Sequence, residues 1–202
     1  MIFFTSDTHF YSDKVLLREH RPFSSTLQMN HVLQCNFNQQ MTKSDTLYVI
    51  GDFGSHDENF ERSYKIARLL NAKVILICGN TEEKIINKHF GGSFKRFREW
   101  CLLHDFEDVI HKKAIVKDLK RDKLYELTHV PTLESGHTPL YGHFHKSPGM
   151  WVLPGLNVAV DSNHFYALSM TNVADMLVYQ EYSKDSMHKH FPTIDITISK
   201  EK

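Results

Sequence analysis

Acidic, amide and imidazole side chains recur in this sequence directly after short apolar runs. Four strings stand at such points: Asp7-Thr8-His9, Gly51-Asp52, Gly79-Asn80 and Gly142-His143-Phe144-His145. Carboxylate and amide oxygens combined with imidazole nitrogens form a ligand set that suits a pair of divalent transition ions. The strings therefore predict a two-metal site, and hydrolysis at phosphorus is the leading hypothesis for its chemistry.

These strings can act together only if the elements before them bring them to one place. Apolar runs predict strands and helical spacing predicts helices in alternation: strands at residues 2–5, 46–50 and 74–78, and helices at 27–41, 60–70 and 82–89. Alternation of strand and helix implies parallel strand pairing. Because ligands at the carboxyl ends of parallel strands converge at one sheet edge, we expect the first three strings to meet there.

The second half of the chain is predicted to hold shorter strands separated by turns rich in proline and glycine. The predicted strands cover residues 114–116, 123–128, 140–141 and 156–160, with a further edge strand at 193–199. His129 follows the second of these runs and supplies another imidazole. In a turn, His143 and His145 can reach different metals. Residues 91–93 and 147–149 read as loops rather than domain boundaries.

Composition limits the alternatives. The 202 residues, 41% of them hydrophobic, suffice for one well-packed core, so we expect a single domain over residues 1–202. Lys plus Arg equals Asp plus Glu at 24 each, which leaves no overall basic field for stable nucleic-acid binding or for an anionic membrane surface. Three cysteines without a CxxC pair, and a beginning without a leader or long apolar stretch, predict a cytoplasmic protein.

A purely structural explanation exists for each string taken alone. The chain has 14 histidines, so one chance His-x-His is unremarkable, and Asp52 or Asn80 can simply bond to nearby backbone amides. Gly51, Gly79 and Gly142 are expected to relieve crowding where the backbone bends beside the ions. Five ligand-bearing segments in a workable order favour the metal site over the structural explanation.

The order of these strings resembles the calcineurin-like metallophosphoesterase superfamily. The pattern is Asp-x-His, Gly-Asp, Gly-Asn-x-Glu, a strand-terminal His and then Gly-His-x-His, and it spans most of the chain. Further segments resemble the small stand-alone bacterial and phage members: residues 4–10, 21–23, 51–53 and 157–161. The resemblance implies an α/β fold of the four-layer αββα sandwich type, as in metallo-dependent phosphatases.

The resemblance also implies a ligand set. It assigns Asp7, His9 and His145 to one metal, and Asn80, His129 and His143 to the other, with Asp52 as the bridging carboxylate. The implied cofactors are two divalent metal ions, with Mn²⁺ favoured and Fe, Ni or Zn compatible with the same ligands. A metal-activated hydroxide between them is the expected nucleophile.

One departure from the family bears on the substrate. The usual Gly-Asn-His string is here Gly79-Asn80-Thr81, and a threonine hydroxyl donates a proton to a leaving group far less readily than an imidazole. We therefore expect a phosphodiesterase acting on a small, nucleotide-type phosphate ester, with Asp52 and Asn80 as catalytic residues. A phosphomonoesterase acting on nucleotides or phosphoproteins is the enzymatic alternative, and a non-catalytic interaction module on the same fold is the other. The sequence leaves the oligomeric state open.

Several nearby residues have two interpretations each. His56, after Asp52, is the candidate to replace the missing histidine, although a solvated loop histidine is the simpler interpretation. Glu82 either orients the metal ligands or caps the following helix, and capping is favoured. Asp161 is equally suited to hold the far nitrogen of His143 or His145 and to be an ordinary turn residue. Residues 94–100 could form a basic, aromatic substrate lip, but their spacing favours an amphipathic helix.

Overall fold

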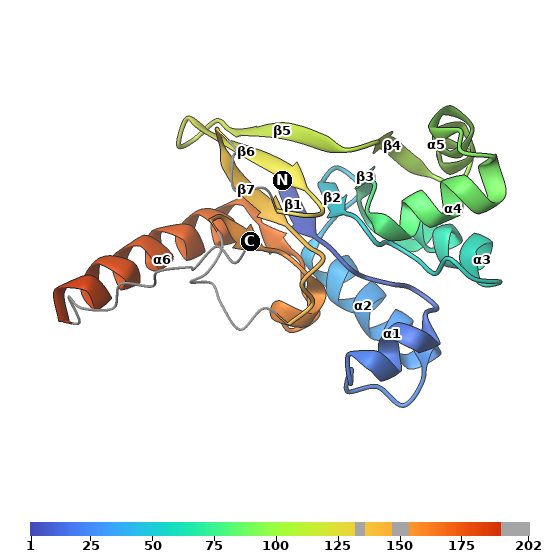
Figure 1. Cartoon of the computed structure of the whole chain (residues 1–202), viewed down its shortest axis with the longest axis horizontal. Coiled ribbons are helices and arrows are strands. Elements are labelled where there is room, and N and C mark those ends of the chain that lie inside the picture. Colours follow the sequence, from blue (N-terminus) through green and yellow to red (C-terminus); the bar gives the residue numbers. More distant parts are fainter. Residues whose placement is uncertain (132–135, 147–153, 191–202) are drawn as a thin grey trace, which may run out of the picture.

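The computed structural model describes residues 1–131, 136–146 and 154–190, with side chains to residue 183 in the last range. Nine strands in this part form two sheets (Figure 1). The five-stranded sheet has the order β4-β3-β2-β1-β9 and contains β1 (Ile2–Thr5), β2 (Thr46–Ile50), β3 (Lys73–Ile77), β4 (Phe106–Ile110) and β9 (Leu168–Ser169). The four-stranded sheet has the order β5-β6-β7-β8 and contains β5 (Lys113–Asp118), β6 (Lys123–Thr128), β7 (Thr138–Tyr141) and β8 (Leu156–Asn157).

Helices fill the connections, which confirms the α/β class. They are α1 (Asp13–Arg18), α2 (Thr26–Gln40), α3 (Phe60–Tyr64), α4 (Asn80–Phe90), α5 (Phe94–Leu102) and α6 (Met170–His190), with 3-10 turns η1 (Lys65–Leu69) and η2 (Val160–Ser162). None of the helices in the described ranges has the length and hydropathy needed to cross a bilayer.

The parallel pairing expected in the first half is confirmed. Strands β1, β2, β3 and β4 pair in parallel, with Thr5 opposite Val49 and Ile50 opposite Ile77. This register ends the strands at nearly the same level, so the loops that follow them leave the sheet at a common edge. In the second sheet, β5 and β6 form an antiparallel hairpin, whereas β6, β7 and β8 are parallel.

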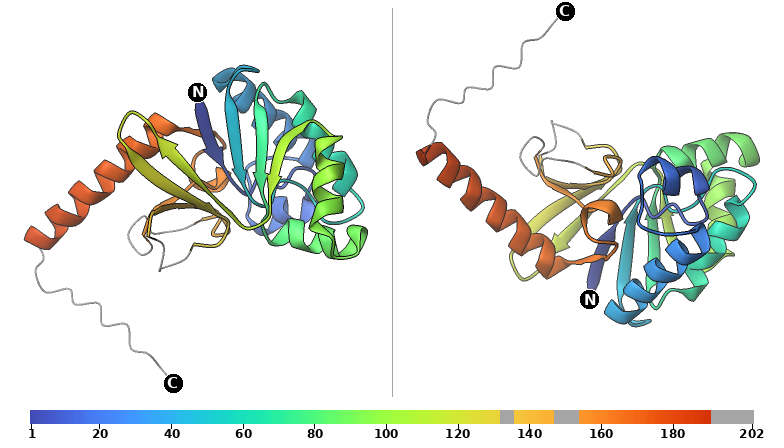
Figure 2. Two further views of the ribbon diagram at one scale, coloured as in Figure 1. Left: turned by 90° about the horizontal axis from the view of Figure 1, so that it is seen from above. Right: turned by 90° about the horizontal axis from the view of Figure 1, so that it is seen from below.

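The five-stranded sheet is apolar on both faces. Phe3 belongs to a core shared with α2, α3, α4 and α5, whereas its neighbour Phe4 packs into a second core with the four-stranded sheet and α6. Successive strand residues point to opposite faces, so a continuous apolar run serves both cores. Figure 2 shows α2, α4 and α5 on one side of the first sheet, and the second sheet with α6 on the other. Full burial of a side chain of this size contributes about 2–3 kcal/mol.

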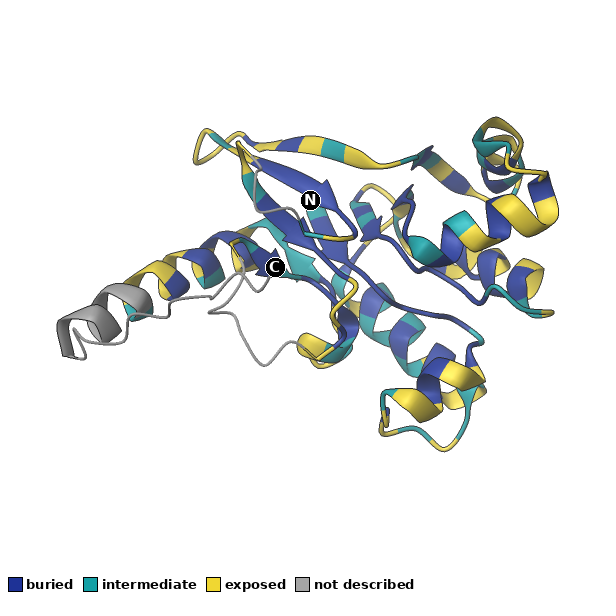
Figure 3. Ribbon diagram, viewed as in Figure 1, coloured by how far each residue is buried: buried dark blue, intermediate teal, exposed yellow. Residues whose placement is uncertain are grey.

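Helix α5 settles the interpretation of residues 94–100. Phe97 is fully buried, and Phe94 and Trp100 pack against the same core, so these rings belong to an amphipathic helix rather than to a substrate lip (Figure 3). The loop expected at residues 91–93 joins α4 to α5, and Gly91 ends α4 in the left-handed conformation.

Other predictions need correction. The strand predicted at 156–160 ends at Asn157, because the Asn157 side chain accepts the Ala159 N–H and Val160 begins η2. The helix predicted at 60–70 is α-helical only to Tyr64 and continues as a 3-10 turn. Strand β4 and helices α1 and α6 were not predicted. The predictions at 147–149 and 193–199 lie outside the described residues.

Candidate metal centre

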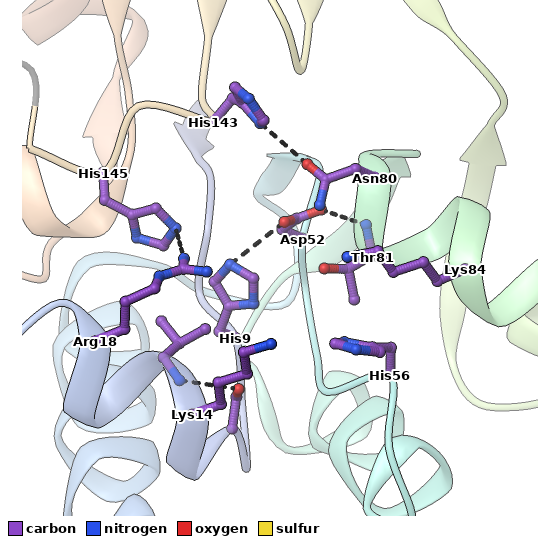
Figure 4. Close-up of a pocket in the computed structure, with 12 residues that line it drawn as sticks. His9, Lys14, Arg18, Asp52, His56, Asn80, Thr81, Lys84, His143 and His145 are labelled. Atoms are coloured by element: carbon purple, nitrogen blue, oxygen red, sulfur yellow. Dashed lines mark hydrogen bonds and ion pairs between the residues drawn. The ribbon is translucent and has the colours of Figure 1, made fainter.

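Loops from both sheets meet at a polar cavity of about 120 Å³ (Figure 4). His9, Asp52 and Asn80, which follow β1, β2 and β3, line it from one sheet, and His143 and His145, which follow β7, line it from the other. Of the predicted site residues, those that line the cavity are His9, Asp52, His56, Asn80, His143 and His145. Asp7 and His129 lie directly beneath them and are buried.

The backbone at this edge is strained. Asp7, His9, Asp52 and His143 all have positive φ, at 55°, 48°, 55° and 69°. Left-handed conformations cost non-glycine residues of order 1–3 kcal/mol each and cluster at functional sites. Backbone hydrogen bonds between the two loops stabilise them here, since the Asp7 N–H donates to Gly51 O and the His9 N–H donates to Asp52 O.

Two glycines allow this close approach, as expected. A Cβ on Gly51 would lie 2.3 Å from His129 Nδ1, and one on Gly142 would lie 1.8 Å from Ser6 Oγ. Neither neighbour can withdraw, because the His129 ring and the Ser6 hydroxyl both bond to the Ile50 carbonyl. The glycines therefore keep the second sheet in contact with the first.

Asp7, His9 and His145 form the first ligand group. Asp7 Oδ1 lies 3.9 Å from His9 Nε2 and 3.6 Å from His145 Nε2. Asp7 Oδ2 accepts hydrogen bonds from Ser6 Oγ and from the His143 N–H, but Asp7 Oδ1 and His9 Nε2 are buried without a hydrogen-bond partner. Unpartnered buried acceptors facing one another are costly unless a cation lies between them, so these residues fit a metal ion.

Asp52 joins this group to a second one. Its Oδ2 lies 3.4 Å from His9 Nε2, and its Oδ1 lies 3.5 Å from His129 Nε2. Asn80 Oδ1 completes the second group at 3.1 Å from His129 Nε2 and 3.0 Å from His143 Nδ1. One carboxylate thus faces both groups, which fits a bridging position between two divalent cations.

Hydrogen bonds on the outer side of the imidazoles fix their orientation. His129 Nδ1 lies 2.9 Å from Ile50 O, and His145 Nδ1 lies 2.7 Å from Asp161 Oδ2. Both rings therefore donate through Nδ1 and leave Nε2 as the acceptor toward the site. Asp161 is in turn held by the buried guanidinium of Arg21, which also donates to the Asp7 carbonyl. Of its two interpretations, the one in which Asp161 holds a site imidazole is confirmed.

Glu82 does more than cap α4. Its carboxylate accepts the backbone N–H groups of Gly79, Asp52 and Phe53 and the hydroxyl of Tyr64, and it is fully buried. The capping role is confirmed by the bond from Gly79, where α4 begins. The bonds from Asp52 and Phe53 tie the loop after β2 to the loop after β3.

Burial and charge together set the protonation states. Burial lowers the pKa of His9 to about 3, so its ring is neutral at neutral pH, and burial also lowers the pKa of His143. Burial alone would raise the pKa of Asp52, but its interactions with the imidazoles of His9 and His129 in their protonated forms, and the Thr81 N–H, lower it. Asp52 in turn helps to raise the pKa of His129 against the effect of burial. Burial raises the pKa of Asp7, against the opposing effects of His129 and His145.

Sequence reasoning missed three cations at the cavity: Lys14 and Arg18 from α1, and Lys84 from α4. Arg18 Nη2 lies 3.4 Å from His145 Nε2. Spacing was the available signal, because Lys84 lies four residues after Asn80 and so falls on the same helix face. His56 lies among these cations rather than beside the ligand atoms (Figure 4).

Comparison with known proteins identifies a protein of the same fold but does not indicate an activity. No known family model matches the chain. The chain is 30% identical over 94 residues to the uncharacterized protein MJ1445 of Methanocaldococcus jannaschii, and the match covers 46% of the chain and 50% of that protein. The chain therefore matches about half the length of this relative. The crystal structure of AQ665, a protein of unknown function from Aquifex aeolicus, aligns with a TM-score of 0.66 at 20% identity over 87% of this chain and 98% of that one. This likeness shows that the two proteins share a fold.

Proposed function

We propose that this protein is a binuclear metal-dependent phosphoesterase, with the four-layer αββα architecture of the calcineurin-like metallophosphoesterases. The observation that carries the proposal is the position of Asp52, whose two oxygens face two separate groups of potential ligands. Buried, unpartnered atoms of Asp7 and His9 in the first group support the presence of a cation there.

The residues of the chain have distinct tasks in this proposal. Asp7, His9, Asp52 and His145 would hold one cation, and Asp52, Asn80, His129 and His143 would hold the other. Two divalent cations, of which Mn²⁺ suits the mixed oxygen and nitrogen ligands, supply Lewis acidity toward phosphoryl oxygens and lower the pKa of an attacking water. Arg18 lies beside His145, where its guanidinium can bind a phosphoryl oxygen.

Phosphodiesters are the proposed substrates because the site has no strong general acid to protonate a poor leaving group. Thr81 is buried, and its N–H donates to Asp52 Oδ1 at 2.8 Å, so this residue supports the bridging carboxylate. Burial and the positive charge of Lys84 lower the pKa of His56, which makes this ring a poorer proton donor at neutral pH. Esters with a good leaving group need the least protonation, and this favours activated diesters.

The test compares metal-dependent hydrolysis of bis-p-nitrophenyl phosphate and p-nitrophenyl phosphate. Protein stripped with a chelator is refilled with Mn²⁺, and bound metal is counted by elemental analysis. We expect about two ions per chain and faster turnover of the diester. Asp52→Asn should lower kcat by roughly a thousandfold or more, because it removes the shared carboxylate charge.

The matched control is Asp57→Asn, five residues further along the same loop, where the carboxylate accepts the Asn59 N–H and no other hydrogen bond from the described side chains. Its kcat should stay within about twofold of wild type. Faster turnover of the monoester would favour the phosphomonoesterase alternative. Unchanged metal content and activity in Asp52→Asn would refute the metal centre, and binding of metal without any turnover would favour an interaction module.

A further inference from the structure

The rim of the cavity carries more positive charge than hydrolysis of a simple diester requires. Lys14 and Lys84 line the cavity from two different helices, with His56 in the loop between β2 and α3. In the described part of the chain neither ammonium group pairs with a carboxylate. Formal charge over the whole chain is zero, so general basicity does not explain this concentration.

The two lysines act on the same spot. Figure 4 shows the side chains of Lys14 and Lys84 on the side of the cavity where His56 lies, and their positive charges add to burial in lowering the pKa of this ring. Asp57, the acidic neighbour of His56, is engaged by the Asn59 N–H. Arg18 differs from the lysines, because its Nε donates to Glu19 and its Nη2 lies beside His145, next to the proposed position of the scissile phosphoryl group.

The cavity also limits what can bind by shape. The cavity is small, at about 120 Å³, and polar or charged residues line it apart from Val15, which suits a phosphoryl group better than the apolar faces of a base. Imidazoles are the only rings among the described residues that line it, so it offers no broad aromatic surface for stacking a base. The groups esterified to phosphorus must therefore extend over the rim, where charge is the available means of selection.

We infer that the substrate is a small phosphodiester that carries a second, uncleaved phosphate group, and that Lys14 and Lys84 bind this second phosphate beside His56. The inference rests on the proposed function, since it assumes that the scissile phosphoryl group occupies the cavity. Two exposed lysines recognise a phosphate by charge and by several N–H donors. A balanced overall charge favours a small substrate over a nucleic-acid strand.

The test uses two substrates with the same scissile bond. Thymidine 5′-(p-nitrophenyl phosphate) and its 3′-phosphorylated counterpart both release p-nitrophenol, but only the second has an additional phosphate. We expect wild-type kcat/KM to favour the 3′-phosphorylated substrate about tenfold, which corresponds to about 1.4 kcal/mol. Lys14→Ala and Lys84→Ala should each lower this ratio about threefold, and the double variant should abolish the preference. Lys84→Arg should keep it.

Lys88→Ala is the matched control, because Lys88 lies one turn further along α4 and does not line the cavity. It removes the same charge and should leave the ratio unchanged. Equal cleavage of both substrates by wild type, or an equal loss of preference in Lys88→Ala, would overturn the inference while leaving the proposed function intact.

A binding measurement separates failure of the inference from failure of the proposed function. Calorimetric titration with thymidine 3′,5′-bisphosphate and thymidine 5′-monophosphate in the presence of Mn²⁺ needs no turnover. A Kd about tenfold lower for the bisphosphate, lost in the double variant, supports the second phosphate site even if neither ester is cleaved. Equal Kd values for the two nucleotides would overturn the second phosphate site. A tetrathymidylate that binds at least tenfold more tightly than the bisphosphate would also overturn it, because such binding would indicate a nucleic-acid strand as the ligand.

Discussion

The two sheets contribute different atoms to the site and hold them in different ways. The loops after strands of the five-stranded sheet carry both carboxylates and the amide, on Asp7, Asp52 and Asn80. The loops after strands of the four-stranded sheet carry three of the four imidazoles, on His129, His143 and His145. Backbone hydrogen bonds between neighbouring loops and the carboxylate of Glu82 fix the first set. Single bonds from the outer ring nitrogen fix His129 and His145 in the second. The oxygen ligands are therefore held by the backbone hydrogen bonds that also connect the loops, whereas each of these imidazoles is held by one side-chain hydrogen bond of its own.

Asp161 is the exception to this difference between the two sheets, because it connects an imidazole of the second set to a loop of the first sheet. It follows the second sheet, yet it bonds to Arg21, which donates to the backbone of the loop after β1. Both side chains of this ion pair are almost fully buried, at 0% and 1% exposure. We expect Asp161→Asn to lower the free energy of unfolding of metal-free protein by about 3–5 kcal/mol, because it leaves a buried guanidinium uncompensated. Urea denaturation in the presence of a chelator measures this.

Asp175→Asn is the control for that variant, since Asp175 is 69% exposed and lies 3.6 Å from Arg121. Its effect should stay within about 0.5 kcal/mol. If Asp161→Asn weakened Mn²⁺ binding with no loss of stability, the two sides of the site would be independent and the comparison would hold throughout.

Glu82→Gln tests how strongly the loops of the first sheet depend on the Glu82 carboxylate. Each carboxylate oxygen accepts two donors, so an amide NH₂ in either position would face two N–H or O–H groups. We expect a loss of about 2–3 kcal/mol in the free energy of unfolding. Glu83→Gln, at the neighbouring half-exposed carboxylate that pairs with His111, should cost less than about 0.5 kcal/mol. Equal effects of the two variants would contradict the role assigned to Glu82.

The smallest expected effect is a pH dependence of stability that differs between the two sheets. His9, after the first sheet, has a pKa lowered by burial to about 3, so in metal-free protein the unfolded chain binds a proton at His9 below about pH 6.5 that the folded chain does not. Folding is therefore penalised by up to about 1.4 kcal/mol per pH unit as the pH falls from 6 to 4. His129, after the second sheet, has a raised pKa, so its contribution is full below about pH 6.5 and is lost as the pH rises through the folded value.

In metal-free protein, the free energy of unfolding should therefore decrease less in His9→Asn than in wild type between pH 6 and pH 4. Urea denaturation of both proteins at each pH measures this. In His129→Asn the gain of stability that wild type shows as the pH falls toward about 6.5 should be absent, because the proton bound more tightly in the folded state is no longer bound. Identical slopes in all three proteins would contradict the opposite electrostatic environments of the two imidazoles.

Much of the site was predictable because its ligands follow strands. Asp7, Asp52 and Asn80 stand just after apolar runs, and parallel pairing places such positions at one edge whatever the details of packing. The partners of Glu82 were not predictable, because two of its donors are backbone N–H groups 29 and 30 residues away, which no side-chain pattern reveals. The α/β class and the parallel pairing of β1, β2 and β3 followed from periodicity, whereas the antiparallel pairing of β9 with β1 was not predicted and the four-layer architecture remains a prediction.

The elements that were missed have weak local signals. Strand β4 has two acidic residues within its five, Glu107 and Asp108, which interrupt the apolar run expected of a buried strand. Helix α6 leaves Val178, Tyr179 and Tyr182 exposed, so its apolar residues do not gather on one face. Lys14 was missed for another reason, since an exposed lysine in a segment with no predicted helix gives no sign of the surface on which it lies, whereas the spacing of Lys84 from Asn80 was a signal that could have been used.

The junction of the two sheets has a consequence for the folding of the chain. Asp7 and His145 lie far apart in the sequence, but Asp7 Oδ1 and His145 Nε2 are 3.6 Å apart, and Asp52 faces both His9 and His129. Ions bound here would cross-link segments separated by most of the chain, and cross-links that close long loops reduce the entropy of the unfolded state the most. Metal loading should therefore slow hydrogen exchange of the β6 and β7 amides more than that of the β4 amides, because opening of the sheet interface would require release of the ions.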